Sequence, residues 1–285
     1  MTSRTWTVRD VIQWSAGDFR TRDLDSPRLD AELLVAEALG TDRVGLYLDL
    51  DRPLDDTEKA AVRALVLRRR EREPVAYILG YRDFFGHRFG VNEAVLIPRP
   101  DTETLVERAL ACIPEDEPLR VLDVGTGSGA VALSVAAARP KASVTATDVS
   151  PAALAVAIAN AQSLGLTANV DFREADIVDD LPPFDVVVSN PPYVTREELA
   201  ELEPEVRDHE PTLALVGGDD GLDVIRVLVD RVAAVTREGA DLLVEVGVGQ
   251  ADRVIELASR IHPWASVASY PDLQGVDRVV HLRRT

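Results

Sequence analysis

The sequence has few of the residues that build disulfide and metal sites. Its 285 residues include one cysteine, Cys112, and four histidines. A single cysteine excludes a disulfide bond within the chain and is typical of a reducing compartment. The histidines are scattered, and with one cysteine they form no group at zinc-binding spacing. We therefore expect no metal.

Long apolar segments are also missing. Residues 1–6 lack the apolar core of a secretion signal, and the most apolar stretch, residues 130–138, is too short to cross a bilayer. The sequence contains no internal repeat and no low-complexity segment. Hydrophobic residues make up 46% of the chain and charged residues 28%, which is ordinary for a soluble globular protein. We expect a cytoplasmic protein without membrane contact.

Positive charge is scarce in the second part of the chain. Residues 1 to 99 carry 16 Lys and Arg against 17 Asp and Glu, whereas residues 100 to 285 carry 15 against 32. Such an acidic part repels nucleic-acid phosphates and can attract a basic protein. DNA or RNA is therefore a less favoured direct substrate, although a local basic groove can coexist with a negative total.

Residues 1–74 are predicted to form a helical bundle. Ser26 and Pro27 are typical of an N-cap followed by proline in the first turn. A later segment begins with acidic residues and ends with arginines, which matches the helix dipole. The predicted helices cover residues 6–19, 27–39 and 42–48, and a longer one runs from Asp55 or Asp56 to about Arg70.

Arginines at positions 68, 69, 70 and 72 form a basic cluster at the end of that helix. Glu71 and Glu73 alternate with them. This pattern favours a solvated helix end, and contact with RNA or a partner protein is the alternative. We assign no site to the cluster.

Residues 75–100 are predicted to be a hairpin linker packed between domains. The stretch 77–90 is rich in aromatic residues and glycine, and an extended segment, 95–100, follows it. Arg99 lies between two prolines, which hold its backbone extended and could aim its side chain. On the sequence alone, we interpret Arg99 as an ordinary exposed arginine in a rigid connector.

From residue 101 onward, helices and strands alternate. After a helix over 101–112, a strand over 120–124 precedes the glycine loop 125–129 and a helix over 130–138. Glycines allow a tight turn and close backbone approach, and the helix N-terminus offers free N–H groups.

The next strand ends at Asp148, about 20 residues beyond the glycine loop, where an acidic side chain can bind both ribose hydroxyls. Gly125, Gly127 and Ala130 also satisfy the G-x-G-x-x-A pattern. A nucleoside cofactor and a dinucleotide therefore both fit this part of the sequence.

The stretch 184–193 is predicted to bind the reacting group of a ligand. Residues 186–188 are β-branched and apolar, as in a central strand covered on both faces, so Asn190 falls at the strand's carboxyl end, where ligands bind in α/β sheets. Asn190 offers a carbonyl acceptor, the backbone carbonyls at Pro191 and Pro192 are free to accept, and Tyr193 offers an aromatic face. Together they predict a clamp for a planar NH₂ group. A strand followed by a proline turn is the alternative.

The chain after residue 193 is predicted to contain further helices and strands. His209 could act as a base, but a lone loop histidine is more often structural or solvated. The predicted helices cover residues 196–206, 222–235 and 251–260, and the predicted strands cover 240–246, 265–270 and 277–282.

The loop 123–129 resembles motif I of class I S-adenosylmethionine methyltransferases. The resemblance implies an α/β, Rossmann-like methyltransferase sheet that follows the helical bundle and the β-hairpin linker. Asp123 would lie near the methionine moiety and Asp148 would bind the ribose, while Asp176 and Ile177 would contact the adenine. The implied cofactor-binding set is Asp123, Gly125, Thr126, Gly127, Ser128, Gly129, Asp148, Asp176, Ile177 and Asn190. Helix-capping roles for Asp123 and Asp176 are alternatives.

The whole chain is similar to the bacterial release factor glutamine methyltransferase family (PrmC/HemK). The resemblance rests on the order and spacing of motifs at residues 73–80, 97–103, 123–129, 190–193, 210–211 and 272–275. It implies methyl transfer from S-adenosylmethionine to the side-chain amide nitrogen of the glutamine in the Gly-Gly-Gln motif of class-1 peptide chain release factors.

In this family, Asn190 and the Pro191 carbonyl would hold the glutamine NH₂, while Pro192 and Tyr193 would shape its slot. Residues 1–74 would help to dock the release factor, and residues 101–285 would form the methyltransferase domain. Ile177 departs from relatives that carry an aromatic residue there, so its adenine contact is less well supported. We expect a monomer.

Three other function classes fit the sequence less well. Methyltransferases acting on N6 of adenine or N2 of guanine use the same motif, but the acidic second part and the lack of a base-reading domain disfavour them. A nicotinamide oxidoreductase would need hydride-handling residues that are not evident. A non-enzymatic binding module would be expected to have lost glycine-loop or clamp residues, and none is missing.

Overall fold

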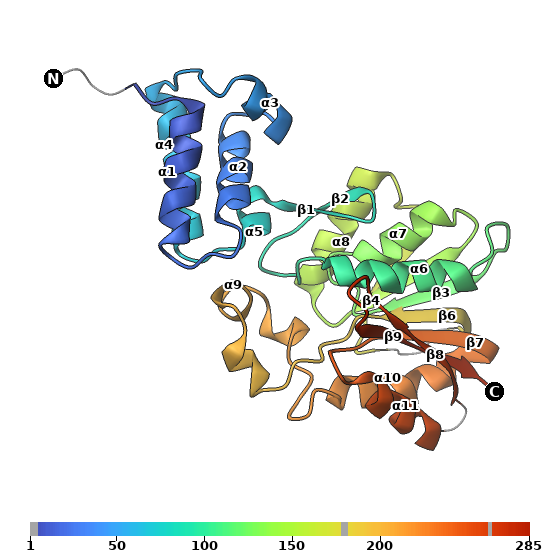
Figure 1. The fold of residues 1–285 in the computed structure, drawn as a ribbon. Helices are drawn as coiled ribbons and strands as arrows, with labels where there is room; N and C mark the ends of the chain where they lie inside the picture. Colours follow the sequence, from blue (N-terminus) through green and yellow to red (C-terminus); the bar gives the residue numbers. More distant parts are fainter. Residues whose placement is uncertain (1–4, 178–181, 262–263) are drawn as a thin grey trace. The chain divides into compact units, whose positions relative to one another are not determined.

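The chain folds into two compact units, and the computed structural model describes residues 5–177, 182–261 and 264–285 (Figure 1). One unit, here called the helical unit, contains residues 1–80 and 204–209. The other, here called the sheet unit, contains residues 81–203 and 210–285. The chain therefore passes from one unit to the other at three places. The substrate-docking role expected for residues 1–74 remains a prediction.

The helical unit confirms the helices predicted before residue 74. Capping boxes begin α1 and α4, in which Thr7 and Asp55 each exchange hydrogen bonds with the residue three positions on. Ser26 precedes α2 as predicted, but its side chain makes no capping hydrogen bond. The unit contains α1 (Val8–Arg20), α2 (Pro27–Ala38), α3 (Arg43–Leu48), α4 (Asp56–Arg70), α5 (Val75–Leu79) and α9 (Pro204–Arg207).

The arginine cluster at the end of α4 forms ion pairs inside the helical unit. Arg69 is 5% exposed, and its guanidinium lies 2.8 Å from Asp30 and 2.9 Å from Glu205. Arg70 pairs with Asp18. The prediction of a solvated helix end was therefore wrong for these two arginines, because their acidic partners are remote in the sequence. Glu205 ties the segment 204–209 to the helical unit.

The sheet unit is built on a seven-stranded sheet in the order β5-β4-β3-β6-β7-β9-β8. The first five strands of that order are parallel, and β9 is antiparallel to both neighbours. The sheet confirms the predicted α/β class. Its strands are β3 (Arg120–Val124), β4 (Ser143–Asp148), β5 (Val170–Glu174), β6 (Phe184–Ser189), β7 (Thr236–Glu245), β8 (Trp264–Pro271) and β9 (Asp277–Arg284).

Helices cover both faces of this sheet, with α6, α7 and α8 on one side and α10 and α11 on the other (Figure 1). Successive strand residues enter opposite cores, as Val121 and Leu122 of β3 do. The bounds are α6 (Glu103–Cys112), α7 (Ala130–Ala138), α8 (Pro151–Leu164), α10 (Asp223–Val232) and α11 (Ala251–Arg260), with 3₁₀ turns η1 (Pro100–Thr102), η2 (Glu198–Glu201), η3 (Thr212–Ala214) and η4 (Ala233–Val235).

The predicted helix over 196–206 was wrong as a continuous element. The chain forms η2, leaves helical geometry at Leu202 and begins the short α9 at Pro204. Proline lacks an N–H donor and fits only the first turn of a helix, so it separates the two turns.

Within the described residues, no helix combines the length and apolar character needed to cross a membrane.

The predicted hairpin is formed by β1 (Tyr81–Phe84) and β2 (His87–Gly90), which pair antiparallel. Positive φ angles at Phe85 and Gly86 make the tight turn. Asn160 of α8 fastens this hairpin to the glycine loop. Its side chain accepts from Gly90 N at 2.7 Å and donates to Gly90 O and Ser128 O at 3.0 and 2.8 Å.

Replacing Asn160 by alanine should lower the free energy of unfolding by about 2–4 kcal/mol, because buried backbone groups lose their partners. Urea unfolding of the full-length protein measures this change. Gln162→Ala on the same helix is the matched control, since Gln162 is exposed, and should change the value by less than about 0.5 kcal/mol. Equal effects of the two substitutions would contradict the fastening role.

Candidate functional site

The candidate site lies where the order of the strands reverses. The chain runs outward from β3 to β4 and β5, and then returns to β6 on the other side of β3. The carboxyl ends of β3 and β6 therefore lie next to each other, and Val124 pairs with Ser189. Ligands of α/β sheets bind in the crevice at such a position.

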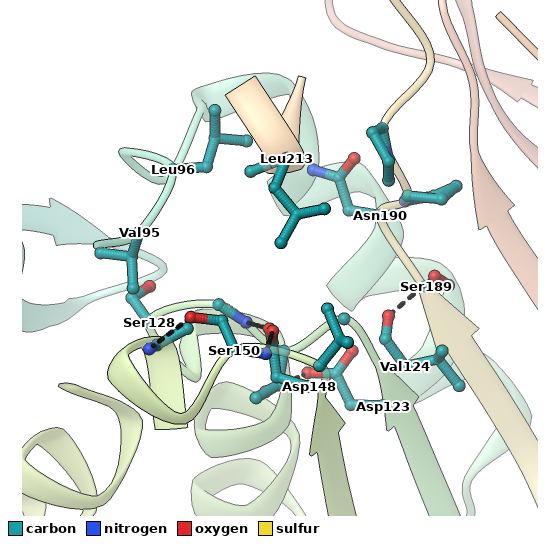
Figure 2. A pocket seen from close by; sticks show the side chains of 18 of the residues that line it. Val95, Leu96, Asp123, Val124, Ser128, Asp148, Ser150, Ser189, Asn190 and Leu213 are labelled. Atoms are coloured by element: carbon teal, nitrogen blue, oxygen red, sulfur yellow. Dashed lines mark hydrogen bonds between the residues drawn. The ribbon is translucent and has the colours of Figure 1, made fainter. Parts of the chain in front are cut away.

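A cavity of about 280 Å³ opens at this position. Figure 2 shows Asp123 and Asp148 on the wall formed by β3 and β4, and Asn190 beyond the end of β6. Val95, Leu96 and Leu213 add apolar side chains. The predicted site residues that line the cavity are Asp123, Gly125, Thr126, Gly127, Ser128, Asp148, Asp176, Ile177, Asn190, Pro191 and Pro192.

The glycine loop exposes its backbone to the cavity. Gly125 and Gly127 have φ angles of 73° and 55°, which residues other than glycine rarely adopt. A Cβ atom at either position would meet no protein atom within 4 Å. Gly129 serves packing instead, because its Cβ would lie 3.0 Å from Leu133 and 3.2 Å from Ala157. The loop therefore offers an open cradle backed by a close contact between α7 and α8.

Asp148 holds the two turns on either side of it. Its Oδ2 atom accepts from Gly127 N at 2.8 Å, and its Oδ1 atom accepts from Ser150 N at 2.9 Å. Each carboxylate oxygen has a second lone pair for another donor. The side chain is half-buried and lines the cavity, so it can also accept from two hydroxyl groups of a ligand.

Asp123 both caps a helix and borders the cavity. It is 2% exposed, and its Oδ2 atom accepts from Thr126 Oγ1 at 2.7 Å and from Ala132 N, in the first turn of α7, at 3.1 Å. Burial raises the pKa of Asp123 to about 7, and these hydrogen bonds only partly oppose it. The capping alternative is therefore part of its role, alongside the contact with the cavity.

Asp176 and Ile177 form the cavity wall beyond β5. Asp176 is exposed, and its carboxylate lies 3.5 Å from Arg231. Ile177 has a φ of 70°, and its carbonyl accepts from Thr147 Oγ1 at 3.3 Å. A backbone so fixed at a β-branched residue presents the Ile177 side chain in one direction. The expected adenine contacts of both residues remain predictions.

Asn190 is held at the end of β6 from two sides. Ser189 Oγ donates to Val124 O at 2.8 Å and closes the junction with β3. Asn190 Nδ2 donates to Thr102 Oγ1 at 3.1 Å. With the amide nitrogen so engaged, Oδ1 remains as an acceptor. Pro191 and Pro192 continue the wall from Asn190.

Tyr193 packs into the protein rather than lining the cavity. Its ring contacts the core beneath β6 and β7, and burial raises the pKa of its phenol to about 12. Glycines enclose the loop on this side: a Cβ at Gly217 would lie 2.4 Å from Pro192 O, and one at Gly221 would lie 2.3 Å from Tyr193 O. Close backbone packing thus fixes the loop 190–193, and its tyrosine stays protonated at neutral pH.

Arg99 has a specific partner, so the prediction of an ordinary exposed arginine was wrong. Its guanidinium forms an ion pair with Glu210, which is 4% exposed. Glu210 Oε2 also accepts from Ile97 N at 3.0 Å. A bond to a carboxylate 111 residues away leaves no local signal. Glu210 therefore anchors the extended segment that leads to Thr102.

His209 belongs to the helical unit and contacts the carbonyl of Glu71 through Nε2 at 3.1 Å. This contact favours the structural interpretation of His209 over a role as a base.

Comparison with known proteins identifies the family. The model described as the PrmC N-terminal domain matches residues 10–80, and that described as the methyltransferase small domain matches residues 102–203. The release factor glutamine methyltransferase of Geobacter sulfurreducens is 44% identical over 96% of both chains. That of Rhodopirellula baltica is 39% identical over 98% of this chain and 97% of its own. The chain belongs to the release factor glutamine methyltransferase family.

A solved methyltransferase structure from Pyrococcus furiosus shares the fold. It is 16% identical, has a TM-score of 0.53 and covers 78% of this chain and 96% of its own. The family models and the relatives confirm the family resemblance and the prediction of an enzyme, and this solved structure confirms the predicted methyltransferase fold.

Two residues near the site, Thr102 and Glu245, were not predicted from the sequence. Thr102 ends the 3₁₀ turn η1 and lies within the motif at residues 97–103, to which no site residue was assigned. Glu245 ends the buried strand β7 and is 1% exposed. An acidic residue directly after the apolar run 242–244 is a readable signal, of the same kind that identified Asn190.

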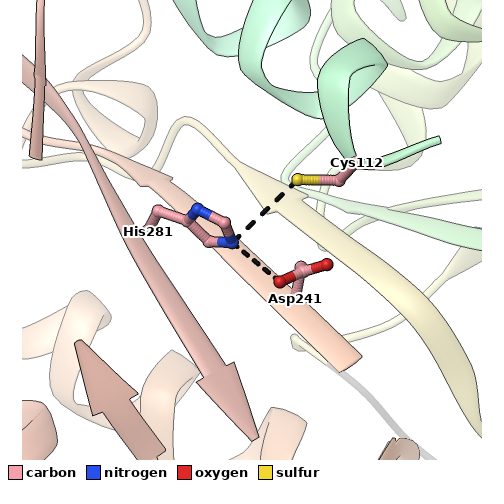
Figure 3. A group of neighbouring side chains, drawn as sticks. All are labelled: Cys112, Asp241 and His281. Atoms are coloured by element: carbon pink, nitrogen blue, oxygen red, sulfur yellow. Dashed lines mark hydrogen bonds and ion pairs between the residues drawn. The ribbon is translucent and has the colours of Figure 1, made fainter. Parts of the chain in front are cut away.

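A second buried cluster in this family member lies away from the cavity. Cys112, Asp241 and His281 place ligand-type atoms within 4.8 Å of one another (Figure 3). Asp241 accepts from His281 Nε2 at 2.8 Å and from Arg283 Nε at 2.9 Å. Burial raises the pKa of the Cys112 thiol to about 11, so it stays protonated. Because Arg283 already balances Asp241, we describe the cluster as an ion pair between the buried Asp241 and the exposed Arg283. The expected absence of a metal remains a prediction.

Proposed function

We propose that this protein transfers a methyl group from S-adenosylmethionine to the side-chain amide nitrogen of the glutamine in the Gly-Gly-Gln motif of class-1 peptide chain release factors. The reaction would take place in the cytoplasm. The observation that carries the proposal is that the free acceptor of Asn190 and the open glycine loop border the same cavity. One pocket can thus hold a nucleoside cofactor and a planar amide side by side.

The residues present fit S-adenosylmethionine. Gly125 and Gly127 leave space that a side chain would fill. Asp148 keeps a lone pair on each carboxylate oxygen for the ribose hydroxyls, and Asp123 offers negative charge near a cationic methionine moiety. Asp176 and Ile177 would bind the adenine. When bound, the cofactor supplies an electrophilic methyl group.

The chain's own contribution is to position the amide. An amide nitrogen is a poor nucleophile because its lone pair is delocalised, so it must be held in line and close to the methyl group. Asn190 Oδ1 and the Pro191 carbonyl would each accept one N–H of the glutamine, with Pro192 and Tyr193 behind them. Such positioning can contribute roughly 7–11 kcal/mol to lowering the barrier.

The same acceptors favour the transition state, in which positive charge develops on the nitrogen. No strong base is needed before methyl transfer. Tyr193 cannot serve as one near neutral pH, because burial raises its pKa to about 12.

The release factor is proposed to dock on the helical unit and to insert its Gly-Gly-Gln loop beside Leu96 and Leu213, which line the cavity. The net charge of −18 suits a basic protein surface better than a nucleic acid. The N-terminal residues expected to assist docking are 1–74.

Substrate identity can be tested directly. The purified protein is incubated with radiolabelled S-adenosylmethionine and, separately, with a purified release factor, duplex DNA or ribosomal RNA. Peptide mass spectrometry then maps the label. We expect label on the Gly-Gly-Gln glutamine alone; label only on nucleic acid would support amino-group methylation of a base and refute the release factor substrate.

Cofactor affinity should depend on pH through Asp123. A cationic ligand binds the ionised carboxylate more tightly than the protonated form. The affinity for S-adenosylmethionine should therefore rise by up to about tenfold per pH unit below about pH 7, and it should become constant above that pH. Isothermal titration calorimetry between about pH 6 and about pH 8 measures it. The Asp123→Asn variant is the control for titration of the ligand itself. Identical pH profiles for the two proteins would rule out this role.

A further inference from the structure

A buried carboxyl group lies level with Asn190 on the neighbouring strand. Val244 of β7 pairs with Ser189 of β6, so Glu245 follows one residue later, as Asn190 does. Glu245 is 1% exposed, and within the described parts of the chain its Oε2 atom has no hydrogen-bond partner. A buried carboxyl oxygen without a partner is costly and requires an explanation.

Thr102 connects Glu245 to Asn190. It is 4% exposed, and its Oγ1 atom accepts from Asn190 Nδ2 at 3.1 Å. Its hydroxyl also lies beside Glu245 and favours the ionised form of that carboxyl. A hydroxyl has one proton to donate, and an ionised carboxylate can only accept. If the proton of Thr102 goes to Glu245, the oxygen of Thr102 is left to accept from Asn190.

We propose that Glu245 and Thr102 are positioning residues that determine which end of the Asn190 amide faces the substrate. In this arrangement Asn190 Nδ2 donates to Thr102 Oγ1, and the Thr102 hydroxyl turns its proton toward the neighbouring Glu245 carboxylate. Asn190 Oδ1 is thereby turned toward the N–H groups of the bound amide. The inference rests on the proposed function, because a substrate that brings N–H groups needs an acceptor at this position.

The direction matters because the two ends of an asparagine amide have the same shape and opposite hydrogen-bonding character. A flipped Asn190 would present its own N–H groups to the N–H groups of the substrate. The clamp would then lack one of its two acceptors. Packing alone does not prevent the flip, whereas an acceptor fixed at Thr102 does.

The charged and titratable groups around Glu245 come from several elements. Arg278 of β9 attracts it, Asp101 of η1 repels it, and the hydroxyls of Tyr193 and Thr102 lie beside it. Burial is the largest influence and raises the pKa of Glu245 to about 7. A protonated Glu245 can donate to Thr102, which reverses the hydrogen bonds. At saturating cofactor, kcat should therefore fall as the pH drops below about 7.

A double-mutant cycle tests whether Thr102 acts through Asn190. The variants are Thr102→Val, Asn190→Ala and the combination, and the readout is kcat for label on the release factor glutamine. We expect Thr102→Val to lower kcat about tenfold in the wild-type background and less than about twofold in the Asn190→Ala background. Thr102→Ser should restore most of the loss. Thr104→Val, at a buried threonine outside the cavity lining, should leave kcat unchanged.

Glu245→Gln adds a second readout. It should lower kcat and abolish the fall below about pH 7, while S-adenosylmethionine still binds. Additive losses in the cycle, no recovery with Thr102→Ser, or a wild-type pH profile in Glu245→Gln would each overturn the inference. If Glu245→Gln does not fold, the Thr102 cycle decides alone. Absence of label on the glutamine with the unaltered protein would instead refute the proposed function.

Discussion

Asn190→Ala is expected to lower kcat by about 10²–10³-fold, as removal of a single preorganised hydrogen-bonding group at a reacting centre does. The affinity for S-adenosylmethionine should change little, because the glycine loop, Asp123 and Asp148 remain in place. Rapid-quench measurement of label on the glutamine and calorimetric titration of the cofactor give the two quantities separately.

Asn169→Ala is the matched control for this substitution. Asn169 lies just before the edge strand β5, at the amino ends of the parallel strands rather than the carboxyl ends, and its backbone hydrogen-bonds to neighbouring residues. This variant should keep wild-type kcat. If Asn190→Ala weakened cofactor binding as much as it lowered kcat, Asn190 would be a cofactor ligand rather than the substrate clamp.

Gly217→Ala is expected to lower kcat about 100-fold by displacing the backbone of the loop 190–193. The new Cβ would lie 2.4 Å from Pro192 O, 2.7 Å from Gly221 O and 2.9 Å from Tyr193 Cα, all backbone atoms that must move. A displacement of about 1 Å at a positioned reactant can cost about 10²-fold in rate. Steady-state kinetics measures the loss, and a crystal structure of the variant would locate the shifted loop.

Gly17→Ala is the control for the chemical change itself. Gly17 lies in α1, its φ is not positive and nothing lies within 4 Å of its Cβ position. That substitution should leave kcat unaltered and stabilise the helix by about 0.5–1 kcal/mol. Wild-type kcat in Gly217→Ala would mean that the loop 190–193 tolerates displacement, and that its close packing does not serve catalysis.

The sequence allowed prediction wherever a function depends on local pattern. The glycine loop, Asp148 and Asn190 follow strands whose apolar runs are readable, and parallel strands bring their carboxyl ends together. The bounds of β3 and α7 were therefore predictable to the residue. The hairpin before residue 90 was recognisable from its glycines and aromatic residues.

Interactions between remote residues were not predictable in this way. Arg69 pairs with the partly buried Glu205 and Arg99 with the buried Glu210, each more than 100 residues away. Spacing gives no information about such partners, so both arginines were interpreted as exposed. Tyr193 was expected beside the substrate, yet its ring fills the core near Gly247, where a Cβ would lie 3.1 Å from Tyr193 Cδ2. Which way a side chain turns at the end of a strand depends on what packs against it.

The segment 204–209 limits how the protein can be dissected. It interrupts the sheet unit, and its Glu205 depends on Arg69 and Arg72 for charge balance. Glu210 follows shortly after Glu205, and its carboxylate accepts a hydrogen bond from the backbone N–H of Ile97 beside the cavity. Deleting residues 1–80 would therefore leave Glu205 without its arginine partners, shortly before Glu210, which anchors the segment beside the cavity. The helical unit therefore cannot be exchanged as residues 1–80 alone. A chimaera that takes this unit from another protein must also take residues 204–209 from that protein.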